Sequence, residues 1–599
     1  MHANGIVSTF LRWRIKHLSN KNFVLILSVI VGIGAGLAAV TLKSTVHYIY
    51  HFLSGNDSLT FSNYWYVVYP FVGLSLTFLI SHFIFKEKLG HGITNILYII
   101  NKKSSKIRPT MTFSRMITSA LTVGFGGSVG LEAPIVATGS AIGSNIARQM
   151  HLNYKYRTLL LGCGAAGAVA GIFNSPIAGV IFVVEVIVVD ISIDIFVPLL
   201  LSAVSGATVS QVLLGEEILF KFDVVDRFMA TEIPFYILLG ITCGLVALHF
   251  TRMQYYFEGL VHKIKNDYLR LVVSGGLLAM LVAVLPGLYG EGYTTIKALI
   301  SGNAVNVVKQ TLFLSDQYYD QVIVLLGIIF ALILVKAIAT ALTIGSGGSG
   351  GIFAPSLMIG ALTGYLIATV INHFGFLQIH VSPANFALVG MCGVFSGVLH
   401  APLTGIFLIA EITGGYALMI PLMLVSAISY VVISYFEPYS IYTKHLVERG
   451  DLVIANRDKM VLKRMDINRL IEKDFKTVHP DAFLGDLIDQ VKVSRRNIFP
   501  VVDSECGLVG VITLDDVRHI MFDSKKQNHV IVRTIMHIPK QVIQIKDGME
   551  TVMAKFESSG KWNLPVVNGE EYIGFISKSS VLSVYRQSLK KHQKETCLE

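Results

Sequence analysis

One carboxylate in an apolar part of the chain stands out as a residue that could do chemistry. Glu132 is the only acidic or basic residue between Arg115 and Arg148, and a run of glycines precedes it while Pro134 follows it. A carboxylate at bilayer depth is costly and by default marks a functional site. Because glycines let the backbone leave helical geometry and Pro134 suits the first turn of a helix, free N–H groups beside Glu132 could face an anion. The plainer interpretation is a glutamate that meets water at the mouth of a helix.

A second glycine-rich segment, residues 347–355, has the same design in the other half of the chain. It reads Gly-Gly-Ser-Gly-Gly-Ile-Phe-Ala-Pro and leads into an apolar stretch. Its backbone N–H groups, at the start of the following helix, would supply positive potential without a cationic side chain. Membrane helices also use small residues for close packing, so this run is informative mainly because it matches the first half.

Three landmarks recur in the same order and indicate an internal repeat. Residues 130–134 match residues 351–355. Residues 174–179, which lead to Glu185, match residues 400–405, which lead to Glu411, and residues 90–92 match residues 290–292 more loosely. Broken half-helices at corresponding places in two halves indicate a binding site near the bilayer midplane. Polar backbone is tolerated at that depth only where it lines a cavity.

The elements that must position these loops are membrane helices. Of the 49 basic and 39 acidic residues among 599, 43 fall in residues 451–599, and the 74 positions between Lys336 and Glu411 hold none. About 20 apolar residues suffice to cross a bilayer. We therefore predict a polytopic α-helical membrane domain over residues 23–450, with repeats at about 23–215 and 230–450 and a candidate membrane helix near 176–205. A collagenous, disordered, purely soluble or single-anchor protein is excluded.

Basic runs at residues 12–16 and 102–108 contribute to the net charge of +10 and flank apolar segments. This positive-inside pattern places both runs, and the N-terminal segment 1–22, in the cytoplasm. Nucleic-acid binding explains them less well, because no basic segment is interleaved with exposed aromatics. The five cysteines lie far apart, so we expect neither a disulfide framework nor a metal site. No small-residue cleavage site follows the first apolar stretch, so a removed signal peptide is not predicted.

The charge-rich tail, residues 451–599, carries a repeat of its own. Residues 499–503 followed by 510–513 match residues 564–568 followed by 574–577. Each set reads as strand, turn, strand and helix, with apolar strands suited to a buried sheet. We expect two small cytoplasmic α/β modules packed as a pair, the first at about 463–525 and the second at about 530–590.

Together these motifs resemble the CLC family of chloride channels and proton-coupled chloride transporters. The resemblance rests on residues 90–93, 130–134 and 351–355, a late Tyr442, and tail modules similar to CBS domains, in the family's order over almost the whole chain. It implies a bacterial-type member in the inner (plasma) membrane, and a homodimer in which each subunit has its own anion pathway between two inverted repeats. It implies chloride, protons and membrane lipids as partners, and no required cofactor.

By position, the resemblance assigns a central chloride to the amides of Ile352 and Phe353 and the hydroxyl of Tyr442, and an outer chloride to the amides of Gly130, Leu131 and Ala133. Glu132 would be the gating glutamate. Ionised, its carboxylate competes with chloride for the same positive potential; protonated, it swings away. Tyr442 has a plainer interpretation as an aromatic residue near the membrane surface.

Two positions depart from the family's pattern. The usual inner-gate serine falls at His91, so an anion there would meet a backbone amide or an imidazole N–H. The glutamate that passes protons to the cytoplasm in the transporters falls at Val186. Its neighbour Glu185 has a mate in Glu411, which favours a repeated structural role. We therefore favour a gated chloride channel tuned by its CBS pair over a chloride/proton antiporter, although water or another acid could carry protons. Fluoride specialisation is disfavoured.

The alternative from another class is a membrane sensor that signals through the tail. Thr513 and Asp516 have the Thr-x-x-Asp spacing with which CBS modules can hold the ribose of an adenine nucleotide, whereas the matching residues 577–580 lack the acid. The plainer interpretation is a dimerisation module with a helix cap at Thr513. The sequence contains no HExxH, nucleophile elbow or Walker loop, so we do not predict an enzyme.

Overall fold

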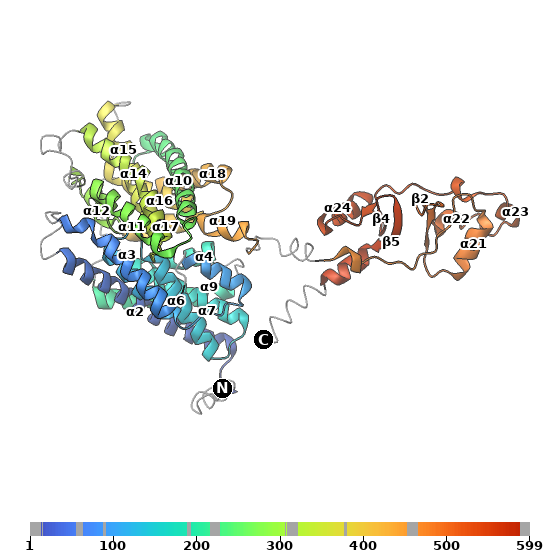
Figure 1. Cartoon of the computed structure of the whole chain (residues 1–599), viewed down its shortest axis with the longest axis horizontal. Helices are drawn as coiled ribbons and strands as arrows, with labels where there is room; N and C mark the ends of the chain where they lie inside the picture. Colours follow the sequence, from blue (N-terminus) through green and yellow to red (C-terminus); the bar gives the residue numbers. More distant parts are fainter. Residues whose placement is uncertain are drawn as a thin grey trace. The chain divides into compact units, whose positions relative to one another are not determined.

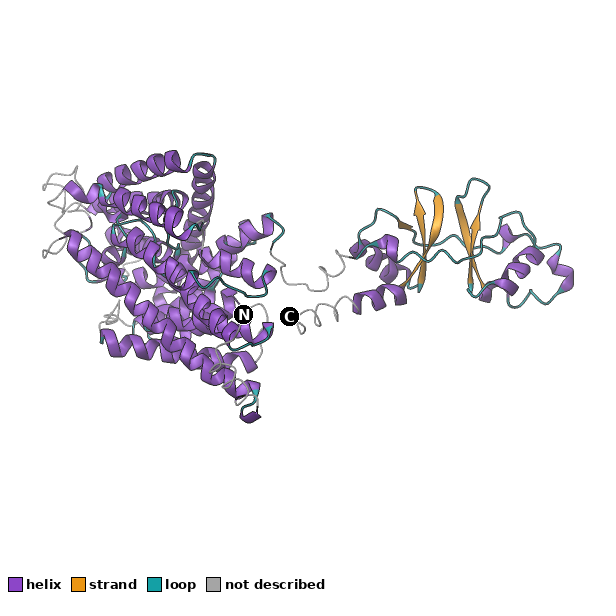
Figure 2. Cartoon of the chain, turned by 60° about the horizontal axis from the view of Figure 1, so that its bottom comes forward, coloured by secondary structure: helices purple, strands orange, loops and turns teal. Residues whose placement is uncertain are grey.

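The computed structural model describes residues 14, 16–54, 64–87, 92–187, 193–215, 228–305, 307, 322–375, 380–451 and 465–586. The chain divides into two compact units, Met1–Leu452 and Val453–Glu599. Figure 2 shows the contrast between them: among the described residues, the first unit is built of helices and all strands lie in the second. The predicted fold class, an α-helical membrane body with an α/β tail, is confirmed.

Helices of the first half are α2 (Asn20–Ser54), α3 (Tyr69–Leu79), α4 (Gly92–Lys102), α5 (Met111–Gly124), α6 (Glu132–Gln149), α7 (Tyr154–Phe173), α8 (Pro176–Phe182) and α9 (Ile193–Leu214). Helices of the second half are α10 (Ile233–His262), α11 (Asp267–Val284), α12 (Tyr293–Ile300), α14 (Val322–Gly345), α15 (Phe353–Phe374), α16 (Pro383–Leu399), α17 (Pro402–Ile412), α18 (Met419–Phe436) and α19 (Ile441–Glu448). Nine helical segments of the described chain are long and apolar enough to cross a membrane.

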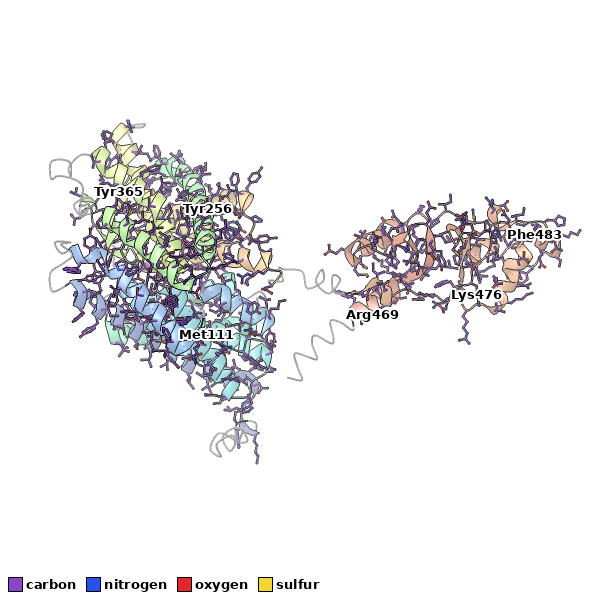
Figure 3. All side chains as sticks on the ribbon, viewed as in Figure 1. Met111, Tyr256, Tyr365, Arg469, Lys476 and Phe483 are labelled. Atoms are coloured by element: carbon purple, nitrogen blue, oxygen red, sulfur yellow. The ribbon has the colours of Figure 1, made fainter. Side chains whose placement is uncertain are left out.

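The two halves pack in the same way. In the first half α2, α7 and α9 pack on one another, and in the second α10, α16 and α18 do so, which Figure 1 shows as a blue-to-cyan and a green-to-orange group. A Cβ added at Gly139 would lie 2.1 Å from the Gly164 oxygen, and one added at Gly360 would lie 2.4 Å from the Gly390 oxygen. Glycines therefore allow α6 against α7 and α15 against α16 to approach closely. Side chains fill the rest of this body (Figure 3).

Two carboxylates cap helices of the opposite half. Glu411, in α17, accepts hydrogen bonds from the N–H groups of Ile177 (3.0 Å) and Ala178 (2.8 Å) at the start of α8. Glu185 does the same for α17, accepting from the N–H groups of Leu403 (3.1 Å) and Thr404 (2.8 Å). This reciprocal capping agrees with the predicted structural role of Glu185 and Glu411, because helix N-termini need hydrogen-bond acceptors and favour negative charge.

The candidate helix near 176–205 is described in two parts. After α8 the chain forms a π-helical segment, Val183–Ile187, and the next described helix is α9, while residues 188–192 lie outside the described residues. Apolar content alone could not predict the π-helical segment, because it is as apolar as its neighbours. Helices α4, α12 and α19 were not predicted either, since each is too short to give a spanning signal.

The tail contains two small sheets. Strand β1 (Ile498–Val502) pairs antiparallel with β2 (Leu508–Thr513). Strand β4 (Asn563–Asn568) pairs parallel with β3 (Ile543–Gln544) and antiparallel with β5 (Glu571–Ser577). The accompanying helices are α21 (Leu484–Val493), α22 (Leu514–Val517), α23 (Ser524–Gln527) and α24 (Met549–Ser559).

Each sheet has its own apolar core. Leu484, Phe499 and Ile512 belong to the first, and Phe556 and Ile576 belong to the second. The segment 467–472 joins the second core although it precedes the first in sequence, and Glu472 pairs with Phe575. The predicted module boundaries stay a prediction.

Candidate functional site

The two glycine-rich loops cross at a single pair of residues. The N–H of Gly130 donates to the oxygen of Gly351, and the N–H of Gly351 donates to the oxygen of Gly130, each at 2.8 Å. This is an antiparallel bridge between equivalent positions of the two halves. The loops therefore meet about an approximate twofold axis, with α6 and α15 both beginning at the crossing.

Equivalent contacts hold each loop against the helix that precedes the other loop. Gly126 (φ 92°) follows the end of α5 and Gly347 (φ 99°) follows the end of α14, both in the left-handed region that favours glycine. The hydroxyl of Thr122 accepts the N–H of Ser349 at 3.1 Å, and that of Thr343 accepts the N–H of Ser128 at 3.3 Å. Each loop is thus bound by the helix of the other half.

Glu132, the first residue of α6, is buried at this crossing, with 1% of its surface exposed. Its Oε1 accepts a hydrogen bond from the hydroxyl of Tyr293. Its Oε2 has no hydrogen-bond partner among the described residues. A Cβ added at Gly130 would lie 2.1 Å from this Oε2 and 3.1 Å from the nitrogen of Ala354. The carboxylate therefore lies beside the first-turn amides of α15.

The residues predicted to hold a central chloride are also buried. Ile352 precedes α15, and Phe353 is its first residue. The Phe353 ring packs against Phe173 and Phe395, with ring centroids 5.1 Å and 4.5 Å away. Tyr442 is 2% exposed, and its hydroxyl has no partner among the described residues. An unpaired buried hydroxyl is costly, which is expected where a ligand completes the site.

The outer loop differs in two respects from the prediction. Gly130, Leu131 and Ala133 are all buried at the start of α6. The amide of Gly130, however, donates to the oxygen of Gly351 at 2.8 Å, and the amide of Leu131 donates to Oε1 of Glu291 at 3.1 Å, so neither is open to an anion. His91 lies outside the described residues.

Sequence reasoning missed Glu291, Tyr293 and Lys336. Lys336 is fully buried in α14, and its Nζ donates to the oxygens of Leu288 (3.3 Å) and Gly290 (3.0 Å). The expectation of positive potential without a cationic side chain is therefore incomplete. The only available signal was the loose match of 290–292 to 90–92, which placed an acid between two glycines.

Within the described residues, no three His, Cys, Asp or Glu side chains are arranged to hold a metal ion. The positive character of this site comes from backbone N–H groups and Lys336. Such a site can hold a small anion or a carboxylate, and a proton can move on or off Glu132.

In the tail, both oxygens of Asp516 have partners. Oδ2 accepts the N–H and the hydroxyl of Thr513, each at 2.7 Å, and Oδ1 lies 3.1 Å from Nε2 of His537. Partial burial acts to raise the pKa of Asp516, but the hydrogen bonds from Thr513 and the nearby His537 outweigh it and lower this pKa. Thr513 and Asp516 therefore form a helix cap in this structure.

Comparisons with known proteins agree on both units. Residues 72–434 match the family model of the voltage gated chloride channel, and residues 466–523 match that of the CBS domain. The "H(+)/Cl(-) exchange transporter ClcA" of Vibrio cholerae is 29% identical over 421 residues, covering 67% of this chain and 84% of that protein. The "Chloride channel protein CLC-f" of Arabidopsis thaliana is 28% identical over 490 residues, covering 72% of this chain, and this chain spans 61% of its length.

Solved structures share the fold. A slow cyanobacterial Cl-/H+ antiporter gives a TM-score of 0.59 at 22% identity, covering 72% of this chain and 99% of that one. A eukaryotic CLC transporter gives 0.60 at 20% identity, covering 94% of this chain and 99% of that one.

Proposed function

Because this chain belongs to the voltage gated chloride channel family, we propose that it moves chloride across a membrane through the crossing of its two glycine-rich loops. The observation that carries this proposal is the buried Oε2 of Glu132 at the crossing, which has no hydrogen-bond partner among the described residues. The Tyr442 hydroxyl is likewise buried without such a partner, and Tyr442 interacts electrostatically with Glu132. The hydroxyl can donate to an anion, and the amides of Ile352 and Phe353 begin a helix whose dipole favours one. The family consists of channels and transporters, so no enzymatic activity is proposed.

Glu132 is the gate in this proposal. Its ionised carboxylate lies next to Gly130 and Ala354, where the potential of the helix starts is positive. A chloride ion would compete with it for that potential. Protonation removes the charge that holds the carboxylate there, so the side chain can leave and chloride can enter.

We propose that chloride moves in exchange for protons. The relative from Vibrio cholerae and the cyanobacterial structure are both named as exchangers of these two ions, which favours exchange over the channel that the sequence alone favours. Passive conduction remains the second candidate, and Val186 supports it, because the resemblance places the acid of the inner proton path there.

The remaining assignments follow the same resemblance. We propose a homodimer in a bacterial plasma membrane, with the tail in the cytoplasm. A nucleotide that uses Asp516 for its ribose would have to displace His537 or Thr513, since both bind that carboxylate. The alternative that the protein is a membrane sensor without ion flux must be excluded by flux measurements.

Flux measurements separate these candidates. The purified protein, reconstituted in liposomes, should drive protons uphill when a chloride gradient is imposed. Chloride flux without proton movement would favour the passive channel. A folded protein that passes no anion would contradict the proposal and favour the sensor.

The gate is tested by Glu132→Gln. A single titrating carboxylate can change the open fraction by up to about a hundredfold over two pH units. We expect the maximal chloride flux of the variant to be high and nearly independent of pH, whereas that of the parent protein rises on acidification. The matched control is Asp267→Asn, at an exposed acid on α11, which should behave like the parent. A parent-like pH response of maximal flux in Glu132→Gln would remove Glu132 from the gate.

A further inference from the structure

A second acid reaches the loop that carries Glu132. Glu291 lies between Gly290 (φ 65°) and Gly292 (φ 94°), both in the left-handed region. A Cβ at Gly292 would lie 2.2 Å from the sulfur of the flexible Met358 side chain in α15, so glycine is favoured there mainly by its backbone conformation. The backbone is thus shaped to hold the intervening residue at one place, the start of α12.

The carboxylate of Glu291 occupies an anion position. Its Oε1 accepts the N–H of Leu131 at 3.1 Å, and Leu131 is the residue directly before the proposed gate. A free amide at the start of α6 would serve an anion. Here a side chain of the protein takes the position that the outer chloride would need.

Charged and titratable groups from four elements face Glu291. They are Lys43 on α2, Glu132 on α6, Tyr293 on α12 and Lys336 on α14. Tyr293 also donates to Glu132, so the two acids are linked through neighbouring residues of one segment. Lys336 holds the carbonyl of Gly290 at 3.0 Å and so brings a buried positive charge beside this segment.

We propose that Glu291 is an internal competitor of chloride at the outer site. Ionised, it keeps the Leu131 amide and raises the chloride concentration needed to fill the site. Protonated, it loses its attraction to that amide and chloride takes its place. Glu132 then sets how much chloride can pass, and Glu291 sets how readily chloride is bound. The inference rests on the proposed chloride transport.

The roles of Glu132 and Glu291 can be distinguished by measuring the half-saturating chloride concentration separately from the maximal chloride flux. In Glu132→Gln liposomes, with equal pH on both sides, the half-saturating chloride concentration should still rise with pH, by up to about tenfold per unit where Glu291 ionises. The sign follows from competition, since higher pH leaves more Glu291 ionised. Adding Glu291→Gln should lower this concentration and make it independent of pH, and Glu291→Asp should restore part of the dependence.

A purely structural Glu291 would give a different result. Its removal would lower thermal stability or maximal flux but leave the pH dependence of half-saturation unchanged, which would overturn the inference. The inference would also be overturned if the half-saturating chloride concentration of Glu132→Gln alone did not depend on pH. No second substitution would then be needed. Asp267→Asn in the same background should change neither quantity. Absence of chloride flux in the parent protein would instead refute the proposed function.

Discussion

At the scale of single residues, the site is defined by polar atoms that the described protein leaves unsatisfied. Buried hydroxyls and carboxylate oxygens nearly always have hydrogen-bond partners. The hydroxyl of Tyr442 and Oε2 of Glu132 do not, although both are almost fully buried. A small anion in the pathway would be a partner for the first and a competitor of the second.

Tyr442→Phe tests this account of the hydroxyl. A neutral hydrogen bond contributes about 1 kcal/mol, so its loss should raise the half-saturating chloride concentration by roughly fivefold. The melting temperature should change little, because the hydroxyl makes no hydrogen bond to the described residues. Tyr236→Phe, the same change at a buried tyrosine of α10, is the control and should leave chloride binding unaltered. A loss of stability without a change in chloride dependence would assign Tyr442 a packing role.

Part of this site could be predicted from residue types alone. Glu132 is conspicuous because the other 31 positions between Arg115 and Arg148 carry no charge, and the match between the two loops singles out Ile352 and Phe353. Glu291 and Tyr293 could not be found in this way. Their contacts with Leu131 and Glu132 join residues about 160 positions apart, and only the folded chain brings them together.

At the scale of elements, the interface between the halves is built from reciprocal contacts, in which each half makes the same contact with the other. The bridge between Gly130 and Gly351 is one, and the crossed caps of α8 and α17 are another. The sequence repeat predicted that the halves are equivalent. It could not predict that each half would supply the acceptor for the other's helix, because a repeat in sequence gives no direction of packing.

Glu185→Gln and Glu411→Gln test whether the caps are structural. An amide retains one acceptor oxygen but turns N–H groups toward the helix N–H groups, which costs about 1–3 kcal/mol for each unsatisfied buried group. Both variants should therefore lower the melting temperature of the purified protein by similar amounts. Their ratio of proton to chloride flux should equal that of the parent. A changed ratio in Glu185→Gln alone would instead make this residue a proton carrier that compensates for Val186.

At the scale of the whole molecule, the chain consists of two units with separate cores. The uneven distribution of charge already predicted this division, because the body is built for lipid and the tail for water. The predicted modules did not reveal that Ile467 and Leu470 pack with the second sheet. Such a contact depends on where the chain enters the tail, and local strand and turn patterns carry no information about it.

The separate cores predict that residues 465–586 fold without the membrane body, and Asp516 provides a test with a defined sign. Its pKa is lowered in the folded tail, so its stabilising contribution is present above the pKa of the unfolded chain and is lost as the pH falls through the folded pKa. Asp516→Asn should cost about 1 kcal/mol of unfolding free energy near neutral pH, and this difference should shrink as the pH falls through the lowered pKa of the folded tail. Urea titration of the isolated tail measures it. Asp515→Asn, at an exposed neighbour paired with Arg518, should cost less than about 0.5 kcal/mol. An Asp516→Asn difference that persists unchanged in acid would show that shape, not charge, makes this cap.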